Sequence, residues 1–441
     1  MIFKIDKQTI DDLGIFGKIR ENSVYGVFNK TMTHGGAQIL EQMFMYPLSE
    51  ENKINERGMI IRYFQNNLTD FPFRSDLFDS VEFYLNNTDS RSRLSAYQDN
   101  LERKFKNVIG TDVEYKLINK GVQSVIEILV TLNQFLTDLK KVGIEKMYQP
   151  QVDAMEELLN INGLKECLKE TNYKKLSYAK TAVYDQEFRY NFRDKLKLLL
   201  HYIYNLDVYI SVAKVSRERN FAYATALPPE INLLEMEDVY HPLLKNPVGN
   251  SIKVDGTNNM IFLTGANMAG KSTFMKTFGI AVYLAHMGFP VPAANMKFSV
   301  QNGMFTTINL PDNMNKGYSH FYAEVMRVKK VAESVGGSKN LIVIFDELFR
   351  GTNVKDAYDA TVAVTEALAG NRNCIFIIST HIIEAGETLR DRCNNINFIN
   401  LPTVMDGTIP RYTYKIAPGI TSDRHGMIII NNEGILDILK R

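Results

Sequence analysis

Residues that could bind nucleotide phosphates lie together in the second half of the chain. Gly265, Gly270, Lys271 and Ser272 fit the pattern G-x-x-x-x-G-K-S/T, which here follows an apolar run and precedes a segment compatible with a helix. Backbone amides of such a loop surround phosphates, the lysine reaches the β- and γ-phosphates, and the serine hydroxyl can ligate Mg²⁺. The context favours a phosphate-binding loop over a chance match in a glycine-containing turn.

Two adjacent carboxylates, Asp346 and Glu347, end a second apolar run that begins at Leu341. An aspartate at a strand end can hold Mg²⁺, and the next carboxylate can orient or deprotonate an attacking water. A third apolar run ends just before His381, which could sense the γ-phosphate or that water. Adjacent acids alone are usually solvated turn residues, and a lone histidine is usually structural. Their order after the phosphate loop favours the catalytic interpretation.

A parallel sheet would bring these residues together. Short apolar runs begin at Asn259, Asn340 and Asn373, and such continuous runs are typical of strands buried on both faces of a parallel sheet. Helical patterns lie between them, for example from Lys355 to Gly370, where the glycine could cap the helix end. Strands that alternate with helices predict an α/β domain.

The first half of the chain predicts long packed helices. Apolar residues recur at three- and four-residue spacing from Val122 to Val142 and from Lys195 to Val215. Prolines are scarce in this half and become frequent from Pro228 onward. We therefore predict a helical domain over residues 1–225 and an α/β domain over residues 226–441.

Composition sets wide limits on function. The 441 residues are 45% hydrophobic and 23% charged, which predicts a folded chain with sizeable cores. The formal net charge of +1 provides no overall basic field, so any nucleic-acid contact needs a local patch. Three widely spaced cysteines, an N-terminus without a signal-like apolar run and the lack of a long apolar stretch favour a cytoplasmic protein without a membrane span.

The phosphate loop resembles that of the MutS family of DNA mismatch-repair ATPases, which are relatives of the ABC-type ATPases. The family loop reads roughly T-G-P-N-M-x-G-K-S-T, and this chain departs from it at Ala266 and Ala269. The resemblance implies that a nucleotide, ATP or ADP, contacts the loop. The residues expected to contribute are Gly265, Ala266, Asn267, Met268, Ala269, Gly270, Lys271, Ser272 and Thr273.

Two later motifs strengthen the resemblance. The segment DELFRGTN is similar to the family's D-E-x-x-R-G-T, and the segment STH is similar to its A-T-H switch. The resemblance implies that Asp346 and Ser272 hold Mg²⁺ and that Glu347, His381 and Lys271 are the catalytic residues. It also implies an α-helical core and lever domain followed by an ABC-type α/β P-loop NTPase domain with a mainly parallel sheet.

A segment between these motifs points to a dimer. The sequence GYSHFYAEV resembles the family signature S-T-F-x-x-E at Ser319, Phe321 and Glu324, with His320 in place of the usual threonine. In the family this signature reaches the partner subunit's nucleotide, so Ser319 is expected to act in trans in a homodimer. The segment VYHPLL resembles R-H-P-V/L, with Tyr240 in place of arginine, and places His241 near the nucleotide by analogy.

The helical half also resembles the family. Thr31 to Arg57 matches its core segment, and Leu206 to Val215 matches the end of its lever helix. Because the core-like segment starts by about residue 20, we expect a short form without the mismatch-binding and connector domains. Residues 143–195 show no obvious β-rich module, so we expect the DNA clamp to be reduced or absent.

Two functional interpretations follow. The favoured one is ATP binding and hydrolysis that drive dimer closure and act on DNA, in mismatch repair or other processing of DNA structures, with a repair-type protein partner. The alternative is a nucleotide-gated protein scaffold of the same ATPase class without direct mismatch recognition, which the expected lack of a mismatch-binding domain and the expected loss of the clamp favour. Lys174, Lys175, Arg189 and Arg193 are interleaved with acids, as on a solvated helical face rather than a phosphate track. A transporter-type ATPase subunit ranks lower, because the signature segment lacks L-S-G-G-Q character.

Overall fold

The computed structural model describes residues 3–17, 22–94, 109–170, 172–309, 320–337, 340–407, 409–421 and 438–439. Its contacts form two compact units. The sheet unit comprises Met1–Phe28, Met43–Gly58 and Val215–Arg441, and the helical unit comprises Asn29–Gln42 and Met59–Lys214. Two N-terminal segments belong to the sheet unit, so the units are not contiguous along the chain, unlike the expected division near residue 225.

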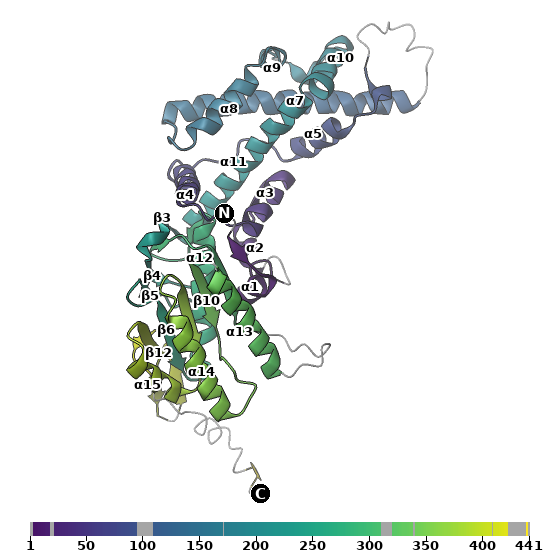
Figure 1. Cartoon of the computed structure of the whole chain (residues 1–441). Helices are drawn as coiled ribbons and strands as arrows, with labels where there is room; N and C mark the ends of the chain where they lie inside the picture. The colour runs from purple at the N-terminus through teal and green to yellow at the C-terminus, as the bar shows by residue number, and fades with distance from the viewer. Residues whose placement is uncertain are drawn as a thin grey trace. The chain divides into compact units, whose positions relative to one another are not determined.

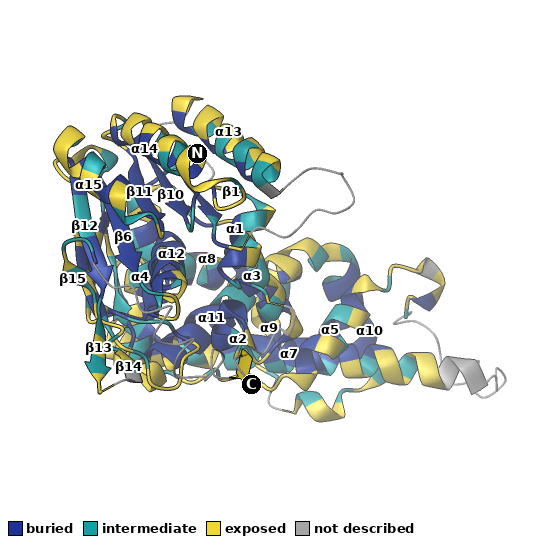
Figure 2. Ribbon diagram, turned by 90° about the horizontal axis from the view of Figure 1, so that it is seen from below, coloured by how far each residue is buried: buried dark blue, intermediate teal, exposed yellow. Residues whose placement is uncertain are grey.

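A mainly parallel seven-stranded sheet lies at the centre of the sheet unit, as expected from the sequence (Figure 1). The strand order is β1-β9-β10-β11-β6-β12-β15, and only the β12–β15 pair is antiparallel. The bounds are β1 Lys4–Ile5, β6 Met260–Gly265, β9 Gly303–Thr307, β10 Leu341–Phe345, β11 Ile375–Ser379, β12 Ile396–Leu401 and β15 Ala417–Pro418. Strands β6, β10 and β11 are buried throughout, which explains their uninterrupted apolar sequences (Figure 2).

Helices pack against both faces of this sheet. The sheet unit contains α1 Lys7–Asp12, α2 Val24–Phe28, α12 Lys271–His286, α13 His320–Gly337, α14 Val354–Ala369 and α15 Ile383–Arg392. Val343 and Phe345 share one core cluster with α13, α14 and α15. Ile344, which alternates with them, lies near Gly279 of α12, so α12 covers the other face.

The end of α14 differs from the sequence expectation. Gly370 follows the helix, but its φ of −61° is right-handed. The left-handed conformation that makes glycine favourable at helix ends is therefore not used here. At the other end, the Asn353 side chain accepts a hydrogen bond from the Asp356 amide at 3.0 Å, which satisfies a donor of the first turn.

Smaller sheets complete the sheet unit. One has the order β3-β8-β4-β5, while β2 pairs with β7 and β13 pairs with β14. The bounds are β2 Ala222–Tyr223, β3 Thr225–Leu227, β4 Leu234–Val239, β5 Asn250–Val254, β7 Pro290–Val291, β8 Asn295–Ser299, β13 Thr403–Asp406 and β14 Ile409–Tyr412.

The helical unit contains the long helices that the periodicity predicts. Helix α7 spans Ile109–Val142, and α11, which begins in this unit, spans Arg193–Arg219. The other helices are α5 Asp76–Asn86, α8 Gln149–Leu159, α9 Asn162–Cys167 and α10 Tyr178–Gln186. Helices α3 His34–Met45 and α4 Glu51–Asn66 each have residues in both units. Within residues 143–195, the described part of the chain forms helices and contains no strand.

His286, at the end of α12, is completely buried in the sheet unit. Its ring lies 4.4 Å from that of Phe3 and 4.8 Å from that of Phe298. The Gln301 amide donates to Nε2 at 3.0 Å, so Nδ1 carries the proton that it shares with the Val282 carbonyl. Burial lowers the pKa of His286 to about 4, because the apolar surroundings disfavour the charged imidazolium.

This buried histidine predicts a loss of stability in mild acid. The unfolded chain binds a proton at His286 below about pH 6.5, whereas the folded chain does so only below about pH 4. The free energy of unfolding should therefore fall by up to about 3 kcal/mol as the pH drops through this window. Urea denaturation at pH 7.5 and pH 5 should show about 2 kcal/mol of this loss. At pH 7.5, His286→Gln should have a lower free energy of unfolding than His34→Gln, the control that alters an exposed histidine. Between pH 7.5 and pH 5, the free energy of unfolding should fall less in His286→Gln than in His34→Gln.

Candidate nucleotide site

The three sequence motifs meet at one edge of the sheet. Strand β11 lies between β10 and β6, and all three are parallel, so their carboxyl ends share an edge. The phosphate loop follows β6, Asp346 follows β10, and Thr380 and His381 follow β11. Crevices beyond the carboxyl ends of parallel strands are where α/β sheets bind ligands. The topology thus brings distant motifs into one site.

Backbone conformation shapes the loop between β6 and α12. Met268 and Gly270 have φ values of 68° and 100°, both in the left-handed region. The left-handed conformation favours glycine at Gly270, and a side-chain carbon there would lie a tight 3.1 Å from the ring of Tyr414. Asn267, Met268, Ser272 and Thr273 are exposed, whereas Ala269 is buried beneath the loop.

Lys271 begins α12 and points into the loop. Its side chain is buried, and Nζ donates to the carbonyl oxygens of Gly265 at 2.8 Å and Ala266 at 3.2 Å. Burial lowers the pKa of Lys271, although the charges of Asp346 and Glu347 oppose this effect. The ammonium is shielded from water and bonded to two backbone carbonyl oxygens, which phosphate oxygens could replace when a nucleotide binds.

Ser272 and Asp346 lie in direct contact. The serine hydroxyl donates to Oδ2 of Asp346 at 2.5 Å, and the hydroxyl of Ser379 donates to Oδ1. The Asp346 amide donates to the Thr307 carbonyl at 2.9 Å, which fixes the backbone at the end of β10. A hydroxyl beside a carboxylate is a hard oxygen donor pair, and Mg²⁺ prefers few protein oxygens together with water and phosphate. The residues therefore fit a magnesium ion.

Glu347 is held by two cationic or proton-donating side chains. Nε2 of His381 donates to Oε1 at 2.7 Å, and Arg350 donates to Oε2 at 3.3 Å. The His381 hydrogen bond, aided by the Arg350 charge, lowers the pKa of Glu347 to about 2 despite its partial burial. The backbone of Glu347 has a φ of 53°, and its amide bonds to the Ser379 carbonyl at 3.1 Å. The carboxylate is thus ionised and aimed by its neighbours.

Helix α13 also contributes to the site. Glu324 is buried, accepts a hydrogen bond from the Gly351 amide at 3.4 Å and lies 3.9 Å from Nε of Arg350. Arg350 is therefore shared between Glu324 and Glu347. Ser319 lies outside the described residues, so its expected role in trans stays a prediction.

Two further residues flank the loop. Burial and the Lys276 charge lower the pKa of His241, which places His241 near α12 but leaves its contact with a nucleotide a prediction. Tyr414 was missed by sequence reasoning, since it lies in an irregular segment with no motif of its own. Its ring is half exposed beside Gly270, where an aromatic face can stack on a nucleotide base.

Two family models together match most of the chain. A family model described as MutS domain III matches residues 8–213, and one described as MutS domain V matches residues 261–439. MutS domain V is a P-loop ATPase domain. None of the described helices combines the length and apolar character needed to cross a membrane.

Several curated relatives carry the name DNA mismatch repair protein MutS. The Petrotoga mobilis protein is 23% identical over 99% of this chain and 64% of its own length. The Clostridioides difficile protein is 24% identical over 87% of this chain and 40% of its own length. The Fusobacterium nucleatum protein is 29% identical over 55% of this chain and 27% of its own length. The chain thus spans between about a quarter and two thirds of these relatives.

Proposed function

The chain belongs to the MutS family, and from this premise we propose that it binds ATP with Mg²⁺ and hydrolyses it at the edge of the β10-β11-β6 sheet. The observation that carries the proposal is the convergence of two pairs of side chains. Ser272 contacts Asp346 at 2.5 Å, and His381 contacts Glu347 at 2.7 Å, beside the buried Lys271. This combination suits transfer of a phosphoryl group to water.

Each residue has a distinct proposed role. Lys271 and the loop amides bind the phosphates and offset their negative charge. Ser272 and Asp346 hold Mg²⁺, which supplies further charge neutralisation when bound. Glu347 orients the attacking water and accepts its proton, and His381 fixes the Glu347 carboxylate. These roles use only groups that lie at the same edge of the sheet.

We further propose that hydrolysis is coupled to closure of a homodimer acting on DNA. This part of the proposal rests on the family resemblance, in which Ser319 of one chain completes the site of the other. Mismatch repair or other processing of DNA structures would follow from closure that moves the helical levers. The proposed substrate is ATP, and the product ADP would stay bound until a new ATP molecule replaces it.

A protein scaffold is the second candidate, because cationic side chains of the helical unit are engaged by acids. Lys140 pairs with Glu156 at 2.6 Å, and Lys180 pairs with Glu170 at 2.7 Å. The Arg189 side chain is 1% exposed and is therefore unavailable to a DNA phosphate. The transporter-type alternative is not retained, because residues 8–213 match MutS domain III.

A binding panel separates DNA action from the scaffold function. Duplex, branched and mismatched DNA are titrated with the full chain, with and without ATP and Mg²⁺, over a range of salt concentrations. DNA action predicts binding that changes with nucleotide and weakens as salt rises, since phosphate contacts release counterions. ATP hydrolysis without binding to any of these DNAs would support the scaffold instead.

A further inference from the structure

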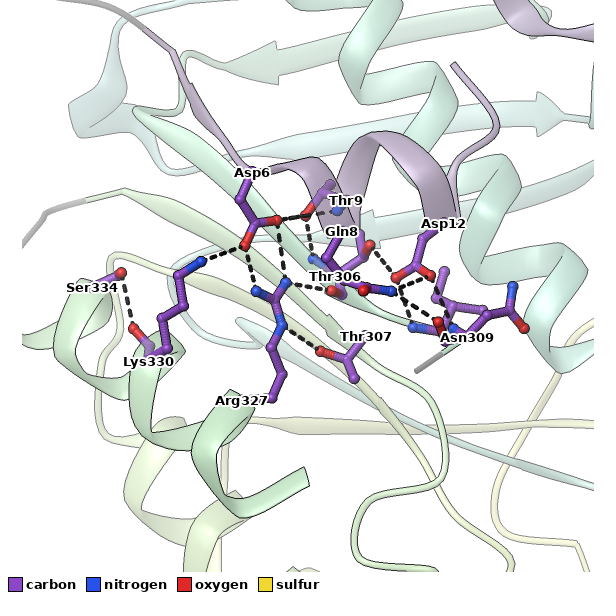
Figure 3. A network of polar contacts seen from close by, with 11 residues as sticks. Asp6, Gln8, Thr9, Asp12, Thr306, Thr307, Asn309, Arg327, Lys330 and Ser334 are labelled. Atoms are coloured by element: carbon purple, nitrogen blue, oxygen red, sulfur yellow. Dashed lines mark hydrogen bonds and ion pairs between the residues drawn. The ribbon is translucent and has the colours of Figure 1, made fainter. Parts of the chain in front are cut away.

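The N-terminal segment of the chain forms one edge of the catalytic sheet. Strand β1 runs parallel to β9, with Lys4 opposite Gly303 and Ile5 opposite Met304. A side-chain carbon at Gly303 would lie 2.4 Å from the Lys4 carbonyl oxygen, so glycine permits this close approach. Helix α1 follows immediately and contacts the carboxyl end of β9 (Figure 3).

Polar side chains of α1 bind the chain as it leaves β9. The Thr9 hydroxyl accepts a hydrogen bond from the Thr306 amide at 2.9 Å. The Asp12 carboxylate accepts from the Thr306 hydroxyl at 2.7 Å, from the Ile308 amide at 2.9 Å and from the Asn309 amide at 3.0 Å. The registered pairing of β1 with β9 ends at Met304, and on this side of β9 these bonds hold the backbone that follows, while β10 pairs with the other side as far as Thr307.

Asp6 connects the same segment to α13. Its carboxylate caps α1 by accepting from Thr9 and is also bonded by both terminal nitrogens of Arg327 and by Lys330 at 3.1 Å (Figure 3). The Asp6 and Arg327 side chains are only 16% and 9% exposed, so solvent screens their attraction weakly. Burial favours protonation of Asp6, but hydrogen bonds from Arg327 and Thr9 and the Arg327 charge hold its pKa well below the usual range.

Arg327 extends this connection to β9. Its Nε donates to the Thr307 hydroxyl at 3.1 Å, and Nη2 donates to the Thr306 carbonyl at 2.6 Å. One guanidinium group thus joins the N-terminal segment, α13 and the end of β9. Lysine could not reproduce this geometry, because its ammonium is a point charge without a planar fork.

Both ends of this network lead to the nucleotide site. The Thr307 carbonyl accepts the amide hydrogen of Asp346 at 2.9 Å. On α13, Glu324 precedes Arg327 by three residues and contacts Gly351 and Arg350, and Arg350 in turn pairs with Glu347. A shift of the β9 end would therefore displace Asp346, and a shift of α13 would displace Glu347 through Arg350.

We propose that Asp6 is a positioning residue for the nucleotide site, which acts through Arg327 to keep Asp346 and Glu347 in place. The inference rests on the proposed ATPase function. Asp6 lies outside the segments that match the family models, and it contacts none of the expected nucleotide ligands. Its role is to set the alignment of groups that bind Mg²⁺ and orient water.

Asp6→Ser tests the proposal, because serine keeps a helix-capping oxygen while removing the charge that faces Arg327. We expect kcat for ATP hydrolysis to fall by about tenfold, since small misplacements of catalytic groups are costly. The Mg²⁺ concentration for half-maximal activity should rise severalfold, while KM for ATP stays within about twofold. Arg327→Lys, which retains the charge but loses the fork, should show a smaller change in the same direction.

Controls separate positioning from loss of folded protein. Glu366→Gln removes an exposed ion pair with Arg392 in the same unit and should behave as wild type. A purely structural role would lower the active fraction without moving the Mg²⁺ midpoint. Folded Asp6→Ser and Arg327→Lys proteins with wild-type kcat and Mg²⁺ midpoint would overturn the positioning role alone. A wild-type chain without ATP hydrolysis would overturn it together with the proposed function. Arg327→Lys decides the test if Asp6→Ser does not fold.

Discussion

Replacing Glu347 with glutamine is expected to leave ATP binding intact while slowing hydrolysis by about a hundredfold or more. Glutamine has nearly the same shape and can still accept a hydrogen bond from His381, but its amide cannot accept a proton from water. The phosphate loop and the Ser272–Asp346 pair are unchanged by the substitution. Binding and turnover should therefore separate.

Glu347→Asp is the matched comparison for this substitution. It keeps a carboxylate but withdraws it by one methylene, so its rate should lie between those of the wild type and Glu347→Gln. ATP affinity is measured by calorimetry, and phosphate release is measured in the steady state. Turnover of Glu347→Gln equal to that of the wild type would remove Glu347 from the catalytic role.

The electrostatics of Glu347 also fix the expected pH dependence. His381 and Arg350 lower its pKa to about 2, so the carboxylate is already ionised well below neutrality. Protonation of Glu347 should therefore not reduce the rate between pH 8 and pH 5. A low pKa also makes Glu347 a weaker base. Before proton transfer, nucleotide binding would therefore have to weaken the contact of Glu347 with either His381 or Arg350.

Removing the Lys271 ammonium is expected to weaken ATP binding itself. Lys271→Ala should lose about 2 to 3 kcal/mol of binding free energy, or roughly 30- to 150-fold in Kd, because a buried charge would no longer face the phosphates. Lys271→Met, which keeps the apolar length of the side chain, should show a similar loss. Equal losses of ATP affinity in the two variants would show that the charge of Lys271, rather than the packing of its side chain, is responsible.

Lys297→Ala serves as the control for Lys271. It removes one exposed lysine from β8 in the same unit and leaves the phosphate loop unchanged. Calorimetric titration with ATP and Mg²⁺ compares the variants. Lys271→Ala with the Kd of Lys297→Ala would contradict the role assigned to Lys271.

The sequence was most informative where one segment carried both a fold signal and a chemical signal. Strands β6, β10 and β11 are continuous apolar runs because both of their faces are buried, and each is followed directly by residues with recognisable chemistry. Parallel strands then place these ends together. The Ser272–Asp346 contact follows from that topology.

Other features could not be predicted because they depend on pairing over long distances. Strand β1 has only two residues, too few to show a period, and it is defined by β9 roughly three hundred residues later. Asp6 resembles an ordinary helix cap in the sequence, and its partner Arg327 resembles a surface cation. Tyr414 could not be predicted either, because it lies in an irregular segment whose sequence gives no sign that it is beside Gly270.

A rapid-quench single-turnover experiment tests the central claim most directly. The chain is mixed in excess with labelled ATP, with and without Mg²⁺, in the wild-type and Glu347→Gln forms, and bound ATP and released phosphate are followed together. We predict Mg²⁺-dependent conversion by the wild type and retention of intact ATP by Glu347→Gln. Wild-type protein that binds ATP but never cleaves it, or two forms that cleave at the same rate, would contradict the claim.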